Sequence, residues 1–294
     1  MVKRILVATD LSPGSDEALR QAAACAQATD AHVAVCHVFP SSLASVPFFA
    51  PNNEPAAAEA SALRSRAFEL LAQQVAQAMP NTKAEVIAEE GNAHAGIVRF
   101  AETWQADLVV VGARGRTALP RMPLGSVAEQ VVRHAHCSVL VARPGVASGI
   151  VLAATDLSNP SLPAVAAGAA EARRRNAKLV VTHAVDFASV KVSLQEMAIG
   201  AFEPNANWNL DNEVRDQVTR ELHKALAHCG AVGTTYVTTG PAAAAVVRYA
   251  EELGAELLVI GARGRTGLLR LVLGSVAERI ISTAGCSVLA VRQA

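Results

Sequence analysis

Two glycine-rich segments contain the residues best suited to bind a phosphorylated ligand. Each has the spacing Gly-x2-Gly-x9-Gly-Ser, and the second begins 149 residues after the first. The pattern occupies Gly112, Gly115, Gly125 and Ser126, and again Gly261, Gly264, Gly274 and Ser275. Glycine lets a ligand approach the main chain closely, and the N–H groups at a helix start attract phosphate. We therefore expect the amides of Gly125, Ser126 and Val127 to meet distal phosphates. Gly112 and Gly115 would lie near a ribose and the first phosphates.

The same serines could instead cap their own helices. Ser126 stands three residues before Glu129, and Ser275 three residues before Glu278, which is the spacing of a capping box. Capping requires neither of the first two glycines, so the full spacing, present twice, favours a ligand. The segments are not P-loops, because no lysine precedes Ser126, and they do not contain GxGxxG.

Other reactive residue types form no pattern that supports catalysis. The chain has no GxSxG, and its spacing indicates neither a Ser-His-Asp arrangement nor a pair of catalytic carboxylates. His134, His136 and the Cys36-His37 pair resemble metal ligands, but His134 and His136 have no counterparts in the second half. We interpret these histidines as structural, and we expect neither catalytic residues nor protein ligands to a metal.

The similarity between the two halves extends well beyond the glycine-rich segments. ILVATDLS (residues 5–12) returns as VLAATDLS (residues 151–158), and CSVLVAR (residues 137–143) returns as CSVLAVR (residues 286–292). The blocks keep the same order in both halves, which indicates the duplication of a whole domain rather than a short solenoid repeat. We expect one domain at residues 1–145 and the other at residues 149–294.

Composition limits the class of protein. The chain has 294 residues, of which 51% are hydrophobic, and its formal net charge is zero. These values are typical of a globular protein and give no general attraction to nucleic acid or to anionic membranes. The first residues, MVKRILVATD, contain neither a secretory signal nor a membrane span, so we expect a cytoplasmic protein. Five cysteines without a CxxC indicate buried thiols rather than a disulfide framework.

Each half alternates short apolar runs with amphipathic segments. Strands are expected at residues 4–9, 32–38, 85–88, 107–112 and 138–142, and at 151–155, 178–184, 234–238, 256–260 and 287–291. In the first half, helices are expected from residue 12 and at 57–79, 95–104 and 126–134. This alternation predicts right-handed βαβ units. The expected fold class is α/β, with two tandem open five-stranded parallel-sheet domains that carry helices on both faces.

The glycine spacing, together with ILVATD on the first strand and CSVLVAR on the last, resembles the universal stress protein family. The second half carries the same features, so the chain is similar to tandem members of the type that binds ATP through G-2x-G-9x-G-[S/T]. The resemblance implies a Rossmann-like fold of the kind found in adenine nucleotide α-hydrolases.

The resemblance also implies which residues contact the nucleotide. The acid that ends the first strand, Asp10 or Asp156 here, would lie beside the nucleoside, and the backbone of Val38 or Ala184 would pair with adenine. Because alanine offers less apolar surface than valine, we expect the second site to hold adenine less well. The expected nucleotide-binding residues are Ala8, Thr9, Asp10, Val38, Gly112, Arg114, Gly115, Gly125, Ser126 and Val127, with Ala154, Thr155, Asp156, Ala184, Gly261, Arg263, Gly264, Gly274, Ser275 and Val276 in the second half.

The function implied by this resemblance is a stress-response regulator that binds ATP or ADP, with Mg²⁺, at one site per domain. A homodimer of the tandem chain and an unknown protein partner belong to the same expectation. No catalytic base stands out, so we expect at most weak ATP hydrolysis. Two alternatives stay open: a slow metal-dependent nucleotide hydrolase that uses Asp10 or Asp156, and a nucleotide-free scaffold whose loops only cap helices. Flavin or another adenine nucleotide is a further candidate ligand.

Overall fold

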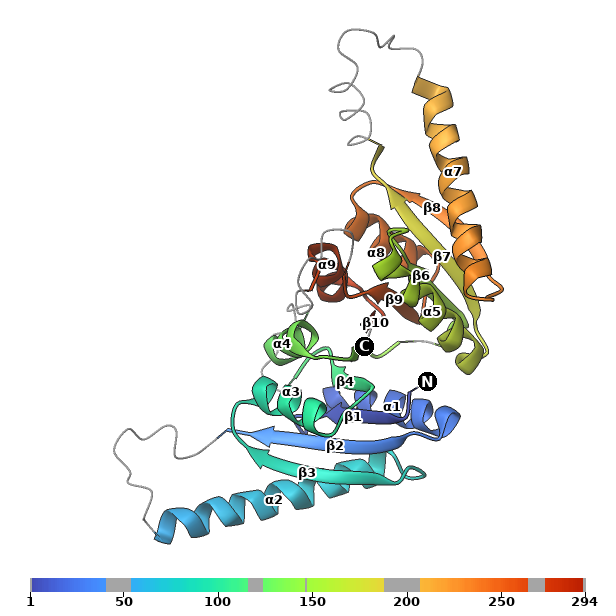
Figure 1. Ribbon diagram of the computed structural model, residues 1–294. Coiled ribbons are helices and arrows are strands. Elements are labelled where there is room, and N and C mark those ends of the chain that lie inside the picture. Colours follow the sequence, from blue (N-terminus) through green and yellow to red (C-terminus); the bar gives the residue numbers. More distant parts are fainter. Residues whose placement is uncertain are drawn as a thin grey trace. The chain divides into compact units, whose positions relative to one another are not determined.

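The chain divides into two compact units, Met1–Pro144 and Gly145–Gln293. A computed structural model describes residues 2–40, 54–115, 124–145, 147–187, 207–263 and 273–292, with backbone alone for 54–60 and 207–210 (Figure 1). Each unit is an α/β domain built around its own parallel sheet, as the sequence predicts.

The first unit contains five strands and the helices between them. Its elements are β1 (Arg4–Ala8), η1 (Pro13–Ser15), α1 (Asp16–Thr29), β2 (His32–Phe39), α2 (Glu54–Ala78), β3 (Ala84–Glu90), α3 (Ala93–Thr103), β4 (Leu108–Gly112), α4 (Ser126–His134) and β5 (Ser138–Ala142). The strands lie in the order β3-β2-β1-β4-β5, and all neighbours are parallel.

The second unit repeats this arrangement. Its elements are β6 (Ile150–Ala154), η3 (Asn159–Ser161), α5 (Leu162–Arg175), β7 (Lys178–Val185), α7 (Asn207–His228), β8 (Thr234–Thr239), α8 (Ala242–Glu252), β9 (Leu257–Gly261), α9 (Ser275–Thr283) and β10 (Ser287–Val291). The strands lie in the order β8-β7-β6-β9-β10, again with parallel neighbours. The predicted fold class is therefore confirmed.

Helices cover both faces of each sheet. In the first unit α1 contacts α2, and α3 contacts α4, so that one pair lies on each face (Figure 1). The central strand β1 is consequently buried on both sides, and Ile5, Leu6 and Val7 have no exposed surface. Burial of such a side chain contributes about 1.5–3 kcal/mol, which explains why these strands are continuous apolar runs.

The elements begin and end close to the expected positions, with small differences that have local causes. Thr9 follows β1 instead of extending it, because its hydroxyl and backbone belong to the loop described below. The helix expected from Ser12 starts as a short 3-10 turn that precedes α1. Asp30 ends α1 in the left-handed conformation, with φ of 53°.

The order of the strands positions the candidate site. After β1 the chain builds the sheet on one side through β2 and β3, and then crosses to the other side at β4. Ligands of open parallel sheets bind at such a reversal, beyond the carboxyl ends of the strands. Ala8 is level with Val111 on β4 and with Cys36 on β2, so Asp10, Gly112 and Val38 all lie near this end of the sheet.

No helix within the described parts of the chain is both long enough and apolar enough to cross a membrane.

Candidate functional site

The loop after β1 is held by hydroxyl groups. The amide of Leu11 donates to Thr9 Oγ1 at 3.0 Å, and Thr9 Oγ1 lies 2.6 Å from Ser15 Oγ. Asp10 Oδ1 accepts a hydrogen bond from the amide of Ser12 at 3.1 Å. These bonds maintain Leu11 at a φ of 63°, which is uncommon for a residue with a bulky side chain. Backbone of this kind is frequent at functional sites, where surrounding contacts offset its cost.

The second unit builds the same loop with the same residue types. The amide of Leu157 donates to Thr155 Oγ1 at 3.0 Å, and Leu157 has a φ of 62°. Thr155 Oγ1 lies 2.7 Å from Ser161 Oγ, and the amide of Ser158 donates to Asp156 Oδ1 at 3.0 Å. Asp10 and Asp156 are therefore presented by equivalent turns.

The carboxylate of Asp10 lies directly against the glycine-rich segment. A Cβ atom on Gly115 would be only 2.7 Å from Asp10 Oδ2, a distance that real Cβ contacts do not show. A side chain at the second glycine of the pattern would therefore displace the carboxylate of Asp10. Gly264, the equivalent residue of the second unit, lies outside the described residues.

A side chain at the first glycine of the pattern would also be crowded. A Cβ on Gly112 would be 3.2 Å from the carbonyl oxygen of Gly14, and a Cβ on Gly261 would be 3.3 Å from the Cα of Ser161. In both units the end of β4 or β9 thus packs against the loop that follows the first strand. The sequence pattern predicted these glycines but gave no indication of Gly14.

The two ends of each glycine-rich segment are joined by backbone hydrogen bonds. The amide of Gly125 donates to the carbonyl oxygen of Ala113 at 2.8 Å, and that of Gly274 to Ala262 at 2.9 Å. The amide of Ala113 in turn donates to Ala142 at the end of β5. The residue before each helix is therefore hydrogen-bonded to the residue that follows the first glycine of the pattern.

Helix α4 begins with a glycine at its N-cap rather than with a capping side chain. Gly125 has extended backbone angles, and its carbonyl oxygen accepts the first helical hydrogen bond from Glu129 at 3.0 Å. Ser126 is the first helical residue, so it is not the N-cap that a capping box requires. Gly274 and Ser275 stand in the same relation at the start of α9. Ser126 and Val127 are exposed, as are Ser275 and Val276.

The residue expected to pair with adenine packs against helix α3. A Cβ on Gly96 would lie 3.1 Å from Val38 Cγ2, so the side chain of Val38 fills the space that this glycine leaves. The second unit has Ala184 and Ala245 at the matching positions. Gly91, at the turn beyond β3, donates its amide to Phe39 at 2.9 Å, which holds this turn beside the end of β2.

One contact of the first unit was not anticipated and has no equivalent among the described residues of the second. The side-chain amide of Gln74, on α2, donates to Asp16 Oδ1 at 2.6 Å and to the carbonyl oxygen of Ser12 at 3.2 Å. Its oxygen accepts from Thr9 Oγ1 at 2.8 Å. Leu71 on α2 and Leu222 on α7 are both fully buried, and we align the two helices at these leucines. In this alignment the residue of α7 that corresponds to Gln74 is Ala225. The sequence feature that could have indicated this contact is the polar residue Gln74 next to the apolar face of its helix.

The histidine of β2 has a structural partner. His37 Nδ1 lies 2.8 Å from the carbonyl oxygen of Thr9, and His183 Nδ1 lies 2.8 Å from that of Thr155. Because a carbonyl can only accept, Nδ1 carries the hydrogen in each ring. Both histidines thus tie the second strand of a unit to the end of the first.

The neighbouring cysteine is not a nucleophile. Burial, with a smaller contribution from the charge of Glu89, raises the pKa of the Cys36 thiol to about 12. A thiol that stays protonated near neutral pH does not attack substrates or bind metal readily. All five cysteines lie in described residues and none forms a disulfide; Cys25, Cys36 and Cys137 are buried, whereas Cys229 and Cys286 are half-buried.

The predicted residues that the structure describes thus lie near one end of each sheet, with differing exposure. Ala8 is buried within β1, and Thr9 is buried in the loop, where its hydroxyl accepts a hydrogen bond from the amide of Leu11. Both residues therefore support the backbone of the site. Ala154 and Asp156 are half-buried, and Thr155 is buried. Arg114 is exposed, while Arg263 is half-buried. In the part of the chain that the structure describes, no three His, Cys, Asp or Glu side chains are grouped as a metal site.

Comparison with known proteins agrees with this architecture. Residues 1–143 and 148–292 each match the universal stress protein family. A universal stress protein of Mycobacterium tuberculosis is 32% identical over 196 residues, which are 64% of this chain and 62% of that protein. The match therefore spans less than two thirds of that relative's length.

A solved structure that covers nearly the whole chain shares its fold. A universal stress protein from Archaeoglobus fulgidus has a TM-score of 0.66 and 19% identity, with 99% of this chain and 96% of that chain covered. A universal stress protein in complex with cAMP is 23% identical over 48% of this chain and 97% of that chain, with a TM-score of 0.36. With the family matched in both halves, the chain belongs to the universal stress protein family and contains two copies of its domain.

Proposed function

We propose that the chain is a cytoplasmic stress-response regulator that binds ATP, with one site at the carboxyl end of the sheet in each domain. The first site comprises the loop after β1, the backbone near Val38 and the glycine-rich segment up to Val127. The second site uses the equivalent residues from Ala154 to Val276.

The start of α4 carries the proposal. Because Gly125 caps the helix without a side chain, the first N–H groups of α4 are left to other partners. Ser126 and Val127 are exposed at this positive end of the helix dipole, beside the strand reversal where ligands bind. Phosphate oxygens suit such a helix start, and α9 offers the same arrangement.

The glycine contacts argue against a purely structural loop. If the serines served only as caps, Ser126 would occupy the N-cap, yet Gly125 has that position. A cap also gives no reason for Asp10 to lie against Gly115. A carboxylate and a row of backbone amides at one sheet end form a suitable environment for a phosphate group and its cation.

The donor set fits Mg²⁺. This ion prefers oxygen ligands and is usually held by one or two carboxylates together with the phosphates of a nucleotide. Asp10 presents a carboxylate at the glycine-rich segment, and the amide of Ser12 fixes its orientation. Asp156 is oriented by Ser158 in the same way. When bound, the ion would neutralise part of the phosphate charge.

The nucleotide content of the purified protein tests the proposal. The protein is denatured, and the released small molecules are separated by chromatography and identified by mass. Gly125→Glu and Gly274→Glu place a carboxylate where phosphate would bind. Gly125→Gln and Gly274→Gln are the matched neutral controls. A Cβ on Gly125 makes only ordinary contacts, 3.5 Å from Ala113 O, and the φ values of −77° and −68° at the two glycines suit any residue.

We expect ATP or ADP from the parent and from both glutamine variants. Each glutamate variant should lose the nucleotide of its own domain, and the double variant should lose both. Added ATP should also raise the melting temperature of the parent, because a ligand of the folded state stabilises it. A parent that is empty, takes up no ATP and shows no such shift would instead support the nucleotide-free scaffold.

Regulation requires that ATP binds two states of the protein with different affinities. We also propose that the chain forms a homodimer and binds a protein partner, and that ATP acts by changing these interactions. Molecular mass measured in solution, with and without ATP, tests the first of these. An unchanged mass would direct attention to a conformational change within one chain.

A further inference from the structure

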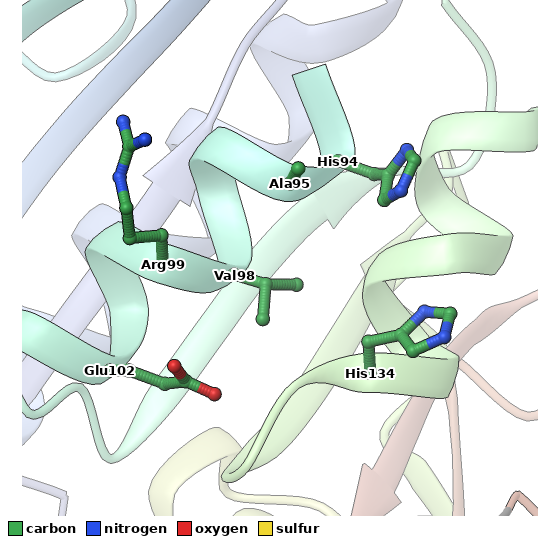
Figure 2. A pocket seen from close by; sticks show the side chains of 6 residues that line it. All are labelled: His94, Ala95, Val98, Arg99, Glu102 and His134. Atoms are coloured by element: carbon green, nitrogen blue, oxygen red, sulfur yellow. The ribbon is translucent and has the colours of Figure 1, made fainter. Parts of the chain in front are cut away.

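None of the residues that line a hollow between α3 and α4 is a candidate nucleotide residue. The hollow has a volume of about 340 Å³ and is lined by His94, Ala95, Val98, Arg99, Glu102 and His134. His94 is in the first turn of α3, and His134 is the last residue of α4. Figure 2 shows the two imidazole rings projecting from neighbouring helices into the same space, whereas Arg99 points away from them.

The two rings lie at a separation from which both could reach one ion. Their centroids are 6.3 Å apart and their planes are inclined by 31°. Metal–nitrogen bonds of about 2.0–2.1 Å would place two imidazole centres roughly 5–6.5 Å apart, depending on the angle at the metal. A small rotation of either side chain is enough to bring both rings to one ion.

His134 has the tautomer that would leave Nε2 able to bind a metal ion. Its Nδ1 lies 2.8 Å from the carbonyl oxygen of Gln130, so Nδ1 carries the hydrogen and Nε2 has the lone pair. Histidines that bind metals usually donate their other N–H to a carbonyl or carboxylate, which fixes the ring and increases its basicity. His134 therefore has the second partner that a metal ligand requires.

The surrounding charges favour a cation. Arg99 pairs with Glu89 at 2.6 Å, and Arg133 with Glu129 at 3.5 Å, so these guanidinium groups are engaged with carboxylates. Glu102 adds a carboxylate to the lining of the hollow. The second unit has Ala243 and Thr283 at the positions of His94 and His134, which confines the pair to the first unit.

We propose that His94 and His134 form a two-histidine site for a divalent transition metal such as Zn²⁺ or Ni²⁺. Imidazole suits these ions, whereas Mg²⁺ prefers oxygen ligands. Among the described side chains no third His, Cys, Asp or Glu joins them, so water completes the coordination. The ion binds reversibly and connects the first turn of α3 to the last turn of α4.

Calorimetric titration of untagged, chelator-treated protein with Zn²⁺ or Ni²⁺ tests this site. We expect one equivalent per chain, no heat of binding with Mg²⁺ at the same concentration, and a rise in melting temperature on adding Zn²⁺. His94→Ala and His134→Ala should each abolish both effects. His136→Ala is the matched control, because His136 is an exposed histidine two residues away and should leave binding unchanged.

Both alanine variants should fold, since His134 is exposed and His94 is half-buried; melting in the absence of metal verifies this. Failure of the parent to bind either ion would overturn the proposal. So would one equivalent of metal retained by either His94→Ala or His134→Ala, or lost from His136→Ala.

Discussion

The carboxylate of Asp10 occupies the space beside the Cα of Gly115 that a side chain would need. A Cβ there would lie 2.7 Å from Asp10 Oδ2. The side chain of Asp10 is held in place by the hydrogen bond that its Oδ1 accepts from the amide of Ser12. A side chain at residue 115 would therefore require the carboxylate of Asp10 to move. This relationship connects the end of β1 to the glycine-rich segment.

Gly115→Ala should weaken ATP binding in the first unit by tenfold or more. The methyl group would push the carboxylate of Asp10 away from the glycine-rich segment, and a loss of about 1.4 kcal/mol in binding free energy corresponds to tenfold in affinity. The measurement is titration with ATP in a Gly274→Glu background, which leaves one site. Gly145→Ala is the control, because nothing lies within 4 Å of a Cβ at Gly145. Equal affinities of the two variants would contradict this prediction.

Asp10→Asn separates the shape of the loop from its charge. Asparagine retains the oxygen that accepts from the amide of Ser12, so the turn and the melting temperature should be preserved. The loss of charge should reduce the part of the ATP affinity that depends on Mg²⁺, which titrations with and without the ion will measure. Asp30→Asn, at the exposed end of α1, is the control because asparagine also tolerates the left-handed backbone.

The same variant distinguishes a regulator from a hydrolase. If slow ATP turnover by the parent disappeared in Asp10→Asn while ATP binding persisted, the hydrolase alternative would gain support. Unaltered Mg²⁺ dependence would show that Asp10 does not assist the cation.

Gln74→Ala should loosen the loop after β1 in the first unit alone. The amide of Gln74 bonds to Asp16 and to the carbonyl oxygen of Ser12, and loss of such partners costs about 1–3 kcal/mol. Hydrogen exchange should become faster at the amide of Leu11 and remain unchanged at Leu157. Gln77→Ala, at an exposed position of the same helix, is the control. Equal acceleration in both units would indicate a global effect instead.

The sequence was informative wherever a feature depended on neighbouring residues along the chain. The apolar run at Ile5–Val7 indicated a buried strand, and repetition of the glycine spacing indicated two equivalent sites. The start of α4 was also predicted, but not its cap: Ser126 matched a capping box, whereas the extended backbone of Gly125 gives that position to the glycine.

Contacts between distant residues could not be derived in this way. Gln74 and Asp16 are 58 residues apart and meet only because α2 packs beside α1. His94 and His134 come together for the same kind of reason, since α3 and α4 cover one face of the sheet. No spacing along the chain encodes either pair.

Gly96 and Val38 should show strong coupling in a double-mutant cycle. Gly96→Ala gains about 1 kcal/mol of helix propensity but forces a methyl group to within 3.1 Å of Val38 Cγ2. Val38→Ala removes that conflict and recreates the Ala184–Ala245 pair of the second unit. We therefore expect Gly96→Ala to be more favourable by about 1 kcal/mol or more when Val38 is alanine. Urea unfolding measures the four proteins, and additive effects would show that the two residues are independent.

Glu171 should make the stability of the second unit sensitive to acid. Burial alone would raise the pKa of Glu171, but hydrogen bonds and charges from Arg174 and Arg175 hold it below its ordinary value of 4.5. A carboxyl whose pKa is lower in the folded state stabilises the protein above the unfolded pKa, and this contribution is lost as pH falls through the folded pKa. The relevant window therefore lies below about pH 4.5.

Glu171→Gln should reduce the free energy of unfolding by about 1–3 kcal/mol near neutral pH, because it removes the carboxylate that Arg174 and Arg175 share. Arg175 retains its pair with Glu256 at 3.3 Å. The difference from the parent should shrink as pH falls through the folded pKa, where the parent's Glu171 also becomes neutral. Urea unfolding across this range provides the measurement. Glu221→Gln, in an exposed pair with Lys224, should change little at any pH. A deficit for Glu171→Gln that stayed constant into acid would mean that packing, and not charge, determines the contribution of this residue.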